Sequence, residues 1–141
     1  MATIKSFTDL SQSKKLAEIL PIESADMVLL HEEPYETTDS KFDGLHQALC
    51  VPFSKYDKSW RQKYKNISYF PCWSIVALLN IIPKHIKNVN TLRIDISEKD
   101  FSIWYDEIGC GVNTELPDIT MENPVDACYE LILKLYEQKL L

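Results

Sequence analysis

A cysteine and a tryptophan stand directly before an apolar run, in the segment Pro71–Ser74. A thiol at a helix N-terminus is favoured as the thiolate, because the helix dipole and the exposed N–H groups stabilise negative charge. Papain-like peptidases begin a helix with such a Cys-Trp pair, but they need a histidine base far downstream. No histidine follows His85 in this chain. The sequence therefore predicts that Cys72 is a packed thiol, Trp73 a core anchor and Ser74 a helix cap, and it assigns no catalytic residue.

Zinc binding is the second chemistry that these residue types could support. His46 and Cys50 are four residues apart, and Cys72 and Cys110 could join them. Structural zinc sites bring their ligands in close pairs, and this chain offers one loose pair. The four cysteines form no C-x-x-C motif and should stay free thiols in a reducing compartment. The sequence therefore predicts core cysteines and surface histidines, with no metal and no cofactor.

General acid–base catalysis would require two converging carboxylates with separated pKa values. Asp100, Asp106 and Glu107 lie at strand ends, and Glu32 and Glu33 lie in a loop. Such neighbours arise by chance in a chain with 21 acidic residues, and the chain carries no glycine-rich phosphate loop or nucleotide fingerprint. We therefore expect a non-enzymatic protein. The alternative is a small hydrolase or transferase of unfamiliar type, in which a thiol or carboxylates would meet a histidine.

A basic and aromatic stretch over residues 54–66 is the clearest feature outside the expected core. Tyr56, Trp60 and Tyr64 are four residues apart and would share one face of a helix. These rings could dock the stretch on its own core, anchor a protein partner or stack on single-stranded nucleic acid, in that order of preference. The residues expected to contact a partner are Tyr56, Lys58, Trp60, Arg61, Lys63 and Tyr64.

Composition and charge limit the class of protein. The chain has 141 residues, 45% of them hydrophobic and 26% charged, which is typical of one ordered globular domain over residues 1–141. A net charge of −6 disfavours a general nucleic-acid binder, although residues 51–90 hold 7 basic residues against 1 acidic. The N-terminus lacks the apolar core of a signal peptide, and the longest apolar run, Ile75–Leu79, is too short to span a bilayer. We expect a cytoplasmic protein that does not enter a membrane.

Helical patterns appear over residues 9–20, 74–82 and 124–139. Asp9 and Gln12 have the spacing of a capping box, and Asn123 followed by Pro124 is typical of a helix start. Residues 27–31 and 45–53 have strand character, and 91–97, 101–106 and 108–112 predict a β-meander over 91–113. The predicted fold class is α+β: a single domain with about three helices on one face of a mainly antiparallel sheet. The expected core residues are Leu16, Leu20, Trp73, Val76, Leu79, Leu92, Ile94, Ile103, Val125, Cys128, Ile132 and Leu135.

Three segments in this order carry a resemblance: Leu16–Met27, Pro71–Ser74 and Asn123–Cys128. Together they resemble a family of small uncharacterised phage or mobile-element proteins from gut anaerobic bacteria. The resemblance implies the same architecture and a mobile-element origin, and it transfers no site residue because the family has no assigned activity. Cys72 stands where that family has a small apolar residue. We expect an accessory protein that binds an unknown protein partner and could form a small homo-oligomer, with residues 54–66 as the contact.

Overall fold

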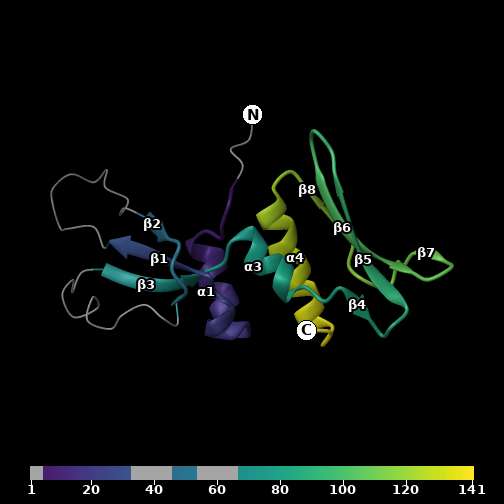
Figure 1. Ribbon diagram of the computed structural model, residues 1–141, viewed down its shortest axis with the longest axis horizontal. Coiled ribbons are helices and arrows are strands. Elements are labelled where there is room, and N and C mark those ends of the chain that lie inside the picture. The colour runs from purple at the N-terminus through teal and green to yellow at the C-terminus, as the bar shows by residue number, and fades with distance from the viewer. Residues whose placement is uncertain (1–4, 33–45, 54–66) are drawn as a thin grey trace. The chain divides into compact units, whose positions relative to one another are not determined.

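The computed structural model describes residues 5–32, 46–53 and 67–141, which form helices and antiparallel sheets (Figure 1). The chain divides into two compact units. The N-terminal unit is Asp9–Ser74, and the C-terminal unit combines Met1–Thr8 with Ile75–Leu141. The α+β class predicted from the sequence is confirmed. A single domain over residues 1–141 stays a prediction.

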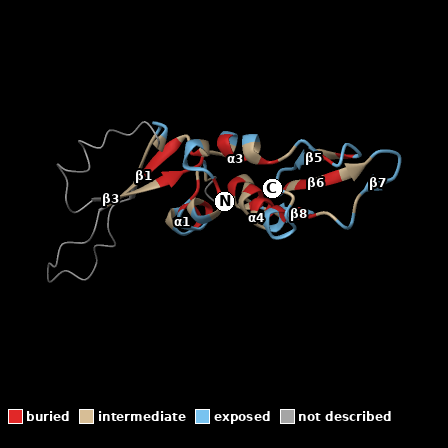
Figure 2. Ribbon diagram, turned by 90° about the horizontal axis from the view of Figure 1, so that it is seen from below, coloured by how far each residue is buried: buried red, intermediate tan, exposed pale blue. Residues whose placement is uncertain are grey.

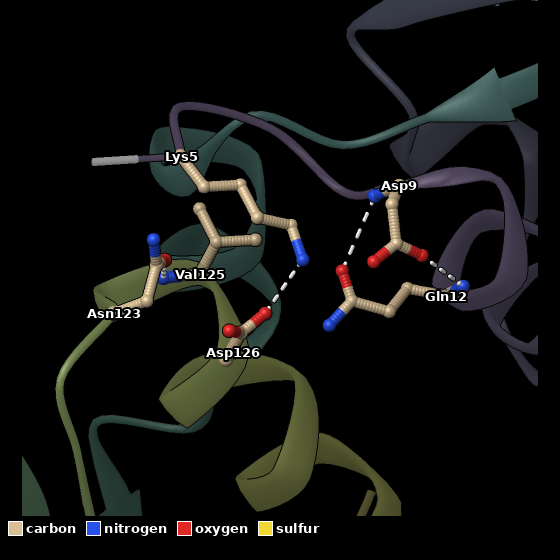
Figure 3. A network of polar contacts seen from close by, with 6 residues as sticks. All are labelled: Lys5, Asp9, Gln12, Asn123, Val125 and Asp126. Atoms are coloured by element: carbon tan, nitrogen blue, oxygen red, sulfur yellow. Dashed lines mark hydrogen bonds and ion pairs between the residues drawn. The ribbon is translucent and has the colours of Figure 1, made fainter. Parts of the chain in front are cut away.

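Helix α1, Leu10–Ile19, opens the N-terminal unit where the sequence predicted a helix over 9–20. The carboxylate of Asp9 accepts from the N–H of Gln12 at 2.9 Å, and the Gln12 side-chain oxygen accepts from the N–H of Asp9 at 3.2 Å (Figure 3). This is the predicted capping box, in which each side chain satisfies a backbone donor that has no partner within the helix. Leu16, on the opposite side of α1 from solvent, is completely buried.

Three antiparallel strands form the sheet of the N-terminal unit in the order β2-β1-β3. Strand β1 is Met27–Glu32, β2 is His46–Leu49 and β3 is Ile67–Cys72, with a 3-10 turn over Ile22–Ser24 before β1. Helix α1 packs against β3. The sequence analysis predicted β1 and β2 but not β3. Pro71 obscures the strand pattern there, and it is tolerated because β3 is an edge strand that needs no further backbone donor at this position.

A five-stranded antiparallel sheet forms the C-terminal unit, in the order β4-β5-β6-β7, with β8 also paired to β6. The strands are β4 (His85–Ile86), β5 (Asn90–Ile96), β6 (Phe101–Glu107), β7 (Gly111–Val112) and β8 (Ile119–Met121). Strands β5, β6 and β7 confirm the predicted β-meander. Gly109, in the turn before β7, and Gly111, at the start of β7, both have a φ of 80°, a left-handed conformation that glycine adopts easily.

Two helices complete the C-terminal unit. Helix α3 is Ile75–Ile81, where 74–82 was predicted, and α4 is Pro124–Glu137, where 124–139 was predicted. The side-chain oxygen of Asn123 accepts from the N–H of Val125 at 2.9 Å, so the predicted cap of α4 is confirmed (Figure 3). The Lys5 ammonium donates to the Asp126 carboxylate at 2.6 Å, which ties the N-terminal segment to the first turn of α4.

The core of the C-terminal unit lies between α4 and the centre of its sheet. Helix α4 contacts β6, β8 and α3, and Figure 2 shows buried positions along α4 and β6. The buried side chains of α4 and β6 are Val125, Ala127, Cys128, Leu131, Ile132, Leu135, Phe101, Ile103 and Tyr105. Eight of the twelve expected core residues are buried in the two units: Leu16, Leu20, Trp73, Ile103, Val125, Cys128, Ile132 and Leu135.

Four residues that were expected in the core are not buried, and that part of the prediction is wrong. Leu79 and Leu92 are half-buried, while Val76 is 62% and Ile94 is 41% exposed. Ile94 lies directly opposite Ile103 in the register of β5 and β6, so both side chains lie on the same face of the sheet. Ile103 is covered because α4 packs on β6 and β8, whereas β5 lies beyond this cover.

Candidate functional site

The segment Pro71–Ser74 has a structural role in the N-terminal unit, as part of its core and the end of β3. Cys72 is the last residue of β3 and not the first residue of a helix, and both Cys72 and Trp73 are completely buried. A buried thiol at the end of a strand has neither the helix N-terminus nor the access that a nucleophile requires. The predictions of a packed thiol at Cys72 and a core anchor at Trp73 are therefore confirmed.

Hydrogen bonds to the turn before β1 hold this segment in place. The indole N–H of Trp73 donates to the hydroxyl oxygen of Ser24 at 2.9 Å, and the Ser24 hydroxyl donates to the Pro21 carbonyl at 2.6 Å. The backbone N–H of Ser74 donates to the Asp26 carboxylate at 2.9 Å, and the Ser74 hydroxyl donates to its other oxygen. These bonds engage the indole N–H of Trp73 and both polar groups of Ser74, which gives the segment a role in folding.

The residues considered for zinc binding do not come together as a site within either unit. Cys50 is exposed and Cys72 is buried in the N-terminal unit, whereas Cys110 is exposed in the C-terminal unit. His46 pairs through its backbone with His31 in the register of β1 and β2. Among the described residues, no group of three or more His, Cys, Asp or Glu side chains could hold a metal ion.

Of the carboxylates considered for acid–base catalysis, Glu33 lies outside the described residues. Glu32 was expected in a loop but is the last residue of β1 in the N-terminal unit. Asp100, Asp106 and Glu107 belong to the C-terminal unit. Asp106 accepts from the indole N–H of Trp104 at 2.8 Å and from the Arg93 guanidinium at 3.3 Å. Asp100 lies in the turn between β5 and β6, where its backbone N–H and carbonyl bond to Ser97. Two donors bound to one carboxylate give Asp106 a structural role on the outer face of β6.

The partner-binding residues predicted in the basic and aromatic stretch are Tyr56, Lys58, Trp60, Arg61, Lys63 and Tyr64. All six lie outside the described residues. Their role as a contact with a protein partner therefore stays a prediction.

The C-terminal unit carries a hollow of about 420 Å³ that the sequence analysis did not find, and we call it the β5 groove. It is lined by Leu79, Lys84, His85, Thr91, Leu92, Arg93 and Ile94. Ile96 follows on the same face of β5 and is 75% exposed. The alternation of Leu92, Ile94 and Ile96 correctly predicted that they share a face. It could not reveal that α4 leaves this part of the sheet uncovered.

The backbone of β5 is open along the same stretch. Strand β4 pairs with Asn90 and Thr91 alone, so no strand of the described chain lies beside Arg93–Ile96 on that side. The N–H of Leu92 donates across this edge to the Lys84 carbonyl at 2.9 Å. Backbone groups of alternate residues in an antiparallel strand point the same way. The N–H and C=O groups of Ile94 and Ile96 therefore point to the open edge.

A positive charge that no carboxylate of the described residues pairs with lies at the end of the groove. The Lys84 ammonium donates to the carbonyls of Leu79 and Ile82, at 3.0 Å in the second case, where the C-terminal end of α3 favours a cation. Within the described residues, no ion pair joins Lys84 to a carboxylate, whereas Arg93 is paired with Asp106. No acidic side chain lines the groove.

A second hollow, of about 670 Å³, lies beside β4 and β7. Its buried polar residue is Asn90, which is 4% exposed. The Asn90 amide donates to the Ile86 carbonyl at 3.2 Å, and its oxygen accepts from the Asn113 amide at 2.9 Å. Because these groups satisfy one another, the asparagine pair fastens the loop after β7 and has a structural role.

Two buried titratable groups of the C-terminal unit are held in their neutral forms. Burial raises the pKa of the Cys128 thiol to about 12, although the Lys84 charge acts in the opposite direction. Burial also raises the pKa of Tyr105 well above its usual range, and its hydroxyl donates to the Pro83 carbonyl at 2.7 Å. Neither group exchanges a proton near neutral pH, so neither suits general acid–base catalysis.

Comparisons with known proteins add no relative: no protein family, curated protein or solved structure matches the chain. In the described part of the chain, every helix is too short or too polar to cross a membrane.

Proposed function

We propose that this protein is a non-enzymatic accessory protein that binds another protein through the β5 groove. The observation that supports this proposal is the exposed apolar face of β5 beyond its pairing with β4, where Ile94 is 41% and Ile96 is 75% exposed. Exposed apolar side chains that form a row beside a hollow are typical of a surface that a partner covers. The Asp106 carboxylate is engaged by two donors, and the buried Cys128 thiol and Tyr105 phenol are neutral, which favours binding over catalysis.

Affinity purification from the native host, with three forms of the protein as bait, tests this proposal. The double variant Ile94→Thr/Ile96→Thr keeps β-branched side chains that suit a strand but removes apolar surface. Ile108→Thr is the matched control, because Ile108 is 71% exposed in the turn after β6, away from the groove. The partner should be retained by the wild type and the control and lost by the double variant. Affinity should fall by roughly tenfold or more, as for central apolar contacts.

An identical set of bound proteins for all three baits would refute the proposed role of the groove. The contact predicted over residues 54–66 has its own variant, Tyr56→Ser/Trp60→Ser/Tyr64→Ser. Loss of the partner with an intact fold would support that contact, and collapse of the fold would identify the three rings as core residues. Comparing the two variants shows which of the two surfaces binds the partner.

The origin and the compartment belong to the same proposal. A phage or mobile-element origin is supported by the sequence resemblance alone, and the gene neighbourhood would test it. A cytoplasmic location is supported by the state of Cys50, Cys72, Cys110 and Cys128, which are all free thiols in the structure. Fractionation of host cells would contradict it if the protein were recovered outside the cytoplasm.

A further inference from the structure

We propose that the partner of the β5 groove is an extended protein segment that adds an antiparallel strand to β5 and places a carboxylate side chain at Lys84. This inference rests on the proposed function, because it assumes that the groove binds a protein. It goes further by naming the conformation, the direction and the charge of the bound segment.

The open backbone favours a strand over a helix. Ile94 and Ile96 present two N–H donors and two carbonyl acceptors at the edge of β5. An extended segment pairs with all four groups, whereas a docked helix pairs with none because its own backbone groups are satisfied internally. Every pairing in this sheet is antiparallel, and an antiparallel ladder is the more stable kind per residue.

The exposed face determines which side chains the segment carries. Residues directly opposite one another in a ladder lie on the same face, so the residues opposite Ile94 and Ile96 would lie beside them. Leu79 and Leu92 line the same groove and are half-buried. The two alternate positions of the segment that face Ile94 and Ile96 should therefore be apolar.

The position of Lys84 determines the charge and the end of the segment. Lys84 accepts from Leu92 across the edge, so it occupies the place opposite Leu92 where an added strand must stop. A segment that runs antiparallel to β5 reaches this place with its C-terminal end. The Lys84 ammonium carries no ion pair with a described carboxylate, and a carboxylate at that end of the segment would supply one.

A second copy of this chain fits the edge less well. Antiparallel pairing of two β5 strands about Ile94 would match Arg93 with Asp95 of the other copy, which is electrostatically favourable. It would also place Ile96 of the other copy opposite Leu92, where Lys84 already lies. The edge therefore favours a segment that ends at Lys84.

A blocked peptide with the sequence Val-Thr-Val-Thr-Glu tests the inference on the full-length protein. Its two valines would face Ile96 and Ile94, and its second threonine would be the last paired residue, opposite Arg93. The glutamate would follow beyond the end of the ladder, because Lys84 occupies the place opposite Leu92, and its side chain would reach the Lys84 ammonium. Titration to millimolar peptide should give saturable shifts of the Ile94 and Ile96 amide resonances. Replacing the glutamate by lysine, or using the Lys84→Glu protein, should weaken binding by about twofold to fivefold. Combining both changes should restore part of the affinity.

Backbone methylation separates strand addition from other ways of filling the groove. Methyl groups on both valine nitrogens remove the donors that face β5, and binding should fall by about tenfold or more. Methyl groups on both threonine nitrogens point away from β5, so this control peptide should bind like the parent. Equal loss with both methylated peptides, or no shift with the parent, overturns the inference.

The binding experiments distinguish failure of the inference from failure of the proposed function. Partner capture that depends on Ile94 and Ile96, combined with peptides that do not bind, would keep a protein-binding groove and reject strand addition. A self-associated protein in sedimentation equilibrium, whose dimer is lost in Ile94→Thr/Ile96→Thr, would identify a second copy as the occupant and reject the inference. If partner capture did not depend on Ile94 and Ile96, both the proposed function and the inference would be rejected.

Discussion

Cys128 and Tyr105 are ionisable groups that the C-terminal unit keeps away from water. Both residues are completely buried, with 0% of their surface accessible to solvent. A group whose pKa is raised by folding stabilises the folded state below its unfolded pKa, and this contribution is lost as the pH rises towards the folded pKa. For Cys128 the window therefore lies between about 9 and about 12.

The first prediction concerns the alkaline stability of the Cys128→Ala variant. In the wild type, the free energy of unfolding should fall by about 1–2 kcal/mol between about pH 8 and about pH 10.5 because of this thiol alone. The variant lacks that part of the decrease, although Tyr105 still titrates in both proteins. Urea unfolding at the two pH values measures the difference. Cys110→Ala, at an exposed cysteine, should keep the wild-type dependence. Equal losses in Cys128→Ala and the wild type would contradict a neutral buried thiol.

The polar contacts around Trp73 show which features of single residues the sequence could predict and which it could not. Burial of Trp73 could be predicted from its place before an apolar run, and it is confirmed. Its bond to Ser24 and the bonds of Ser74 to Asp26 could not be predicted, because the partners are 49 and 48 positions apart. Only the pairing of β1 with β3 brings these positions together. That pairing is non-local, and one sequence contains no direct sign of it.

The helix caps belong to the next scale, because each one defines where an element begins. Replacing Asn123 by Ala removes the oxygen that accepts from the N–H of Val125 at 2.9 Å. We expect a loss of about 1 kcal/mol in the free energy of unfolding. Asn123→Asp is the matched control, because it keeps the acceptor and adds a negative charge that the N-terminus of α4 favours. Chemical denaturation measures both variants, and an equal loss in both would show that the loss does not come from the missing acceptor oxygen.

The two halves of the β5–β6 ladder give the next prediction. Ile103 and Ile94 are directly opposite one another, but Ile103 is completely buried and Ile94 is 41% exposed. Ile103→Ala should therefore cost about 2–5 kcal/mol of stability through the cavity it leaves. Ile94→Ala should cost less than about 1 kcal/mol, because its methyl groups already contact water. Similar losses in thermal or urea unfolding would show that β5 is covered in solution.

Local patterns predicted most elements, and cover by a neighbouring element was the part they could not predict. The capping box of Asp9, the start of α4 and the β-meander all depend on residues close together in sequence, and all three are confirmed. Whether Ile94 is buried depends on which strands α4 covers, which is decided by packing between distant parts of the chain. The β5 groove was missed for this reason. Its only sign in the sequence was the apolar alternation that was taken as core.

At the scale of the whole molecule, the chain leaves the C-terminal unit after Thr8 and returns to it at Ile75. The carbonyl of Ser6 accepts from the N–H of Ile75 at 3.2 Å, and Lys5 is paired with Asp126 at 2.6 Å. Ser6, which lies two residues before the chain leaves the unit, is therefore hydrogen-bonded to Ile75, where the chain returns. Such closely spaced ends are typical of a segment that can be inserted or removed without strain.

The last prediction follows from these closely spaced ends. A chain in which a short Gly/Ser linker replaces residues 9–74 should fold, because the C-terminal unit keeps its own core between α4 and β6. It should unfold cooperatively, with dispersed amide resonances and the Ile94 and Ile96 signals little changed from the full chain. The smaller chain buries less apolar surface, which would lower the stability of the C-terminal unit but leave its structure intact. A molten chain with collapsed resonances would instead support a single cooperative domain over residues 1–141. In that case the intact β5 groove would require the whole protein, and every binding experiment would have to use it.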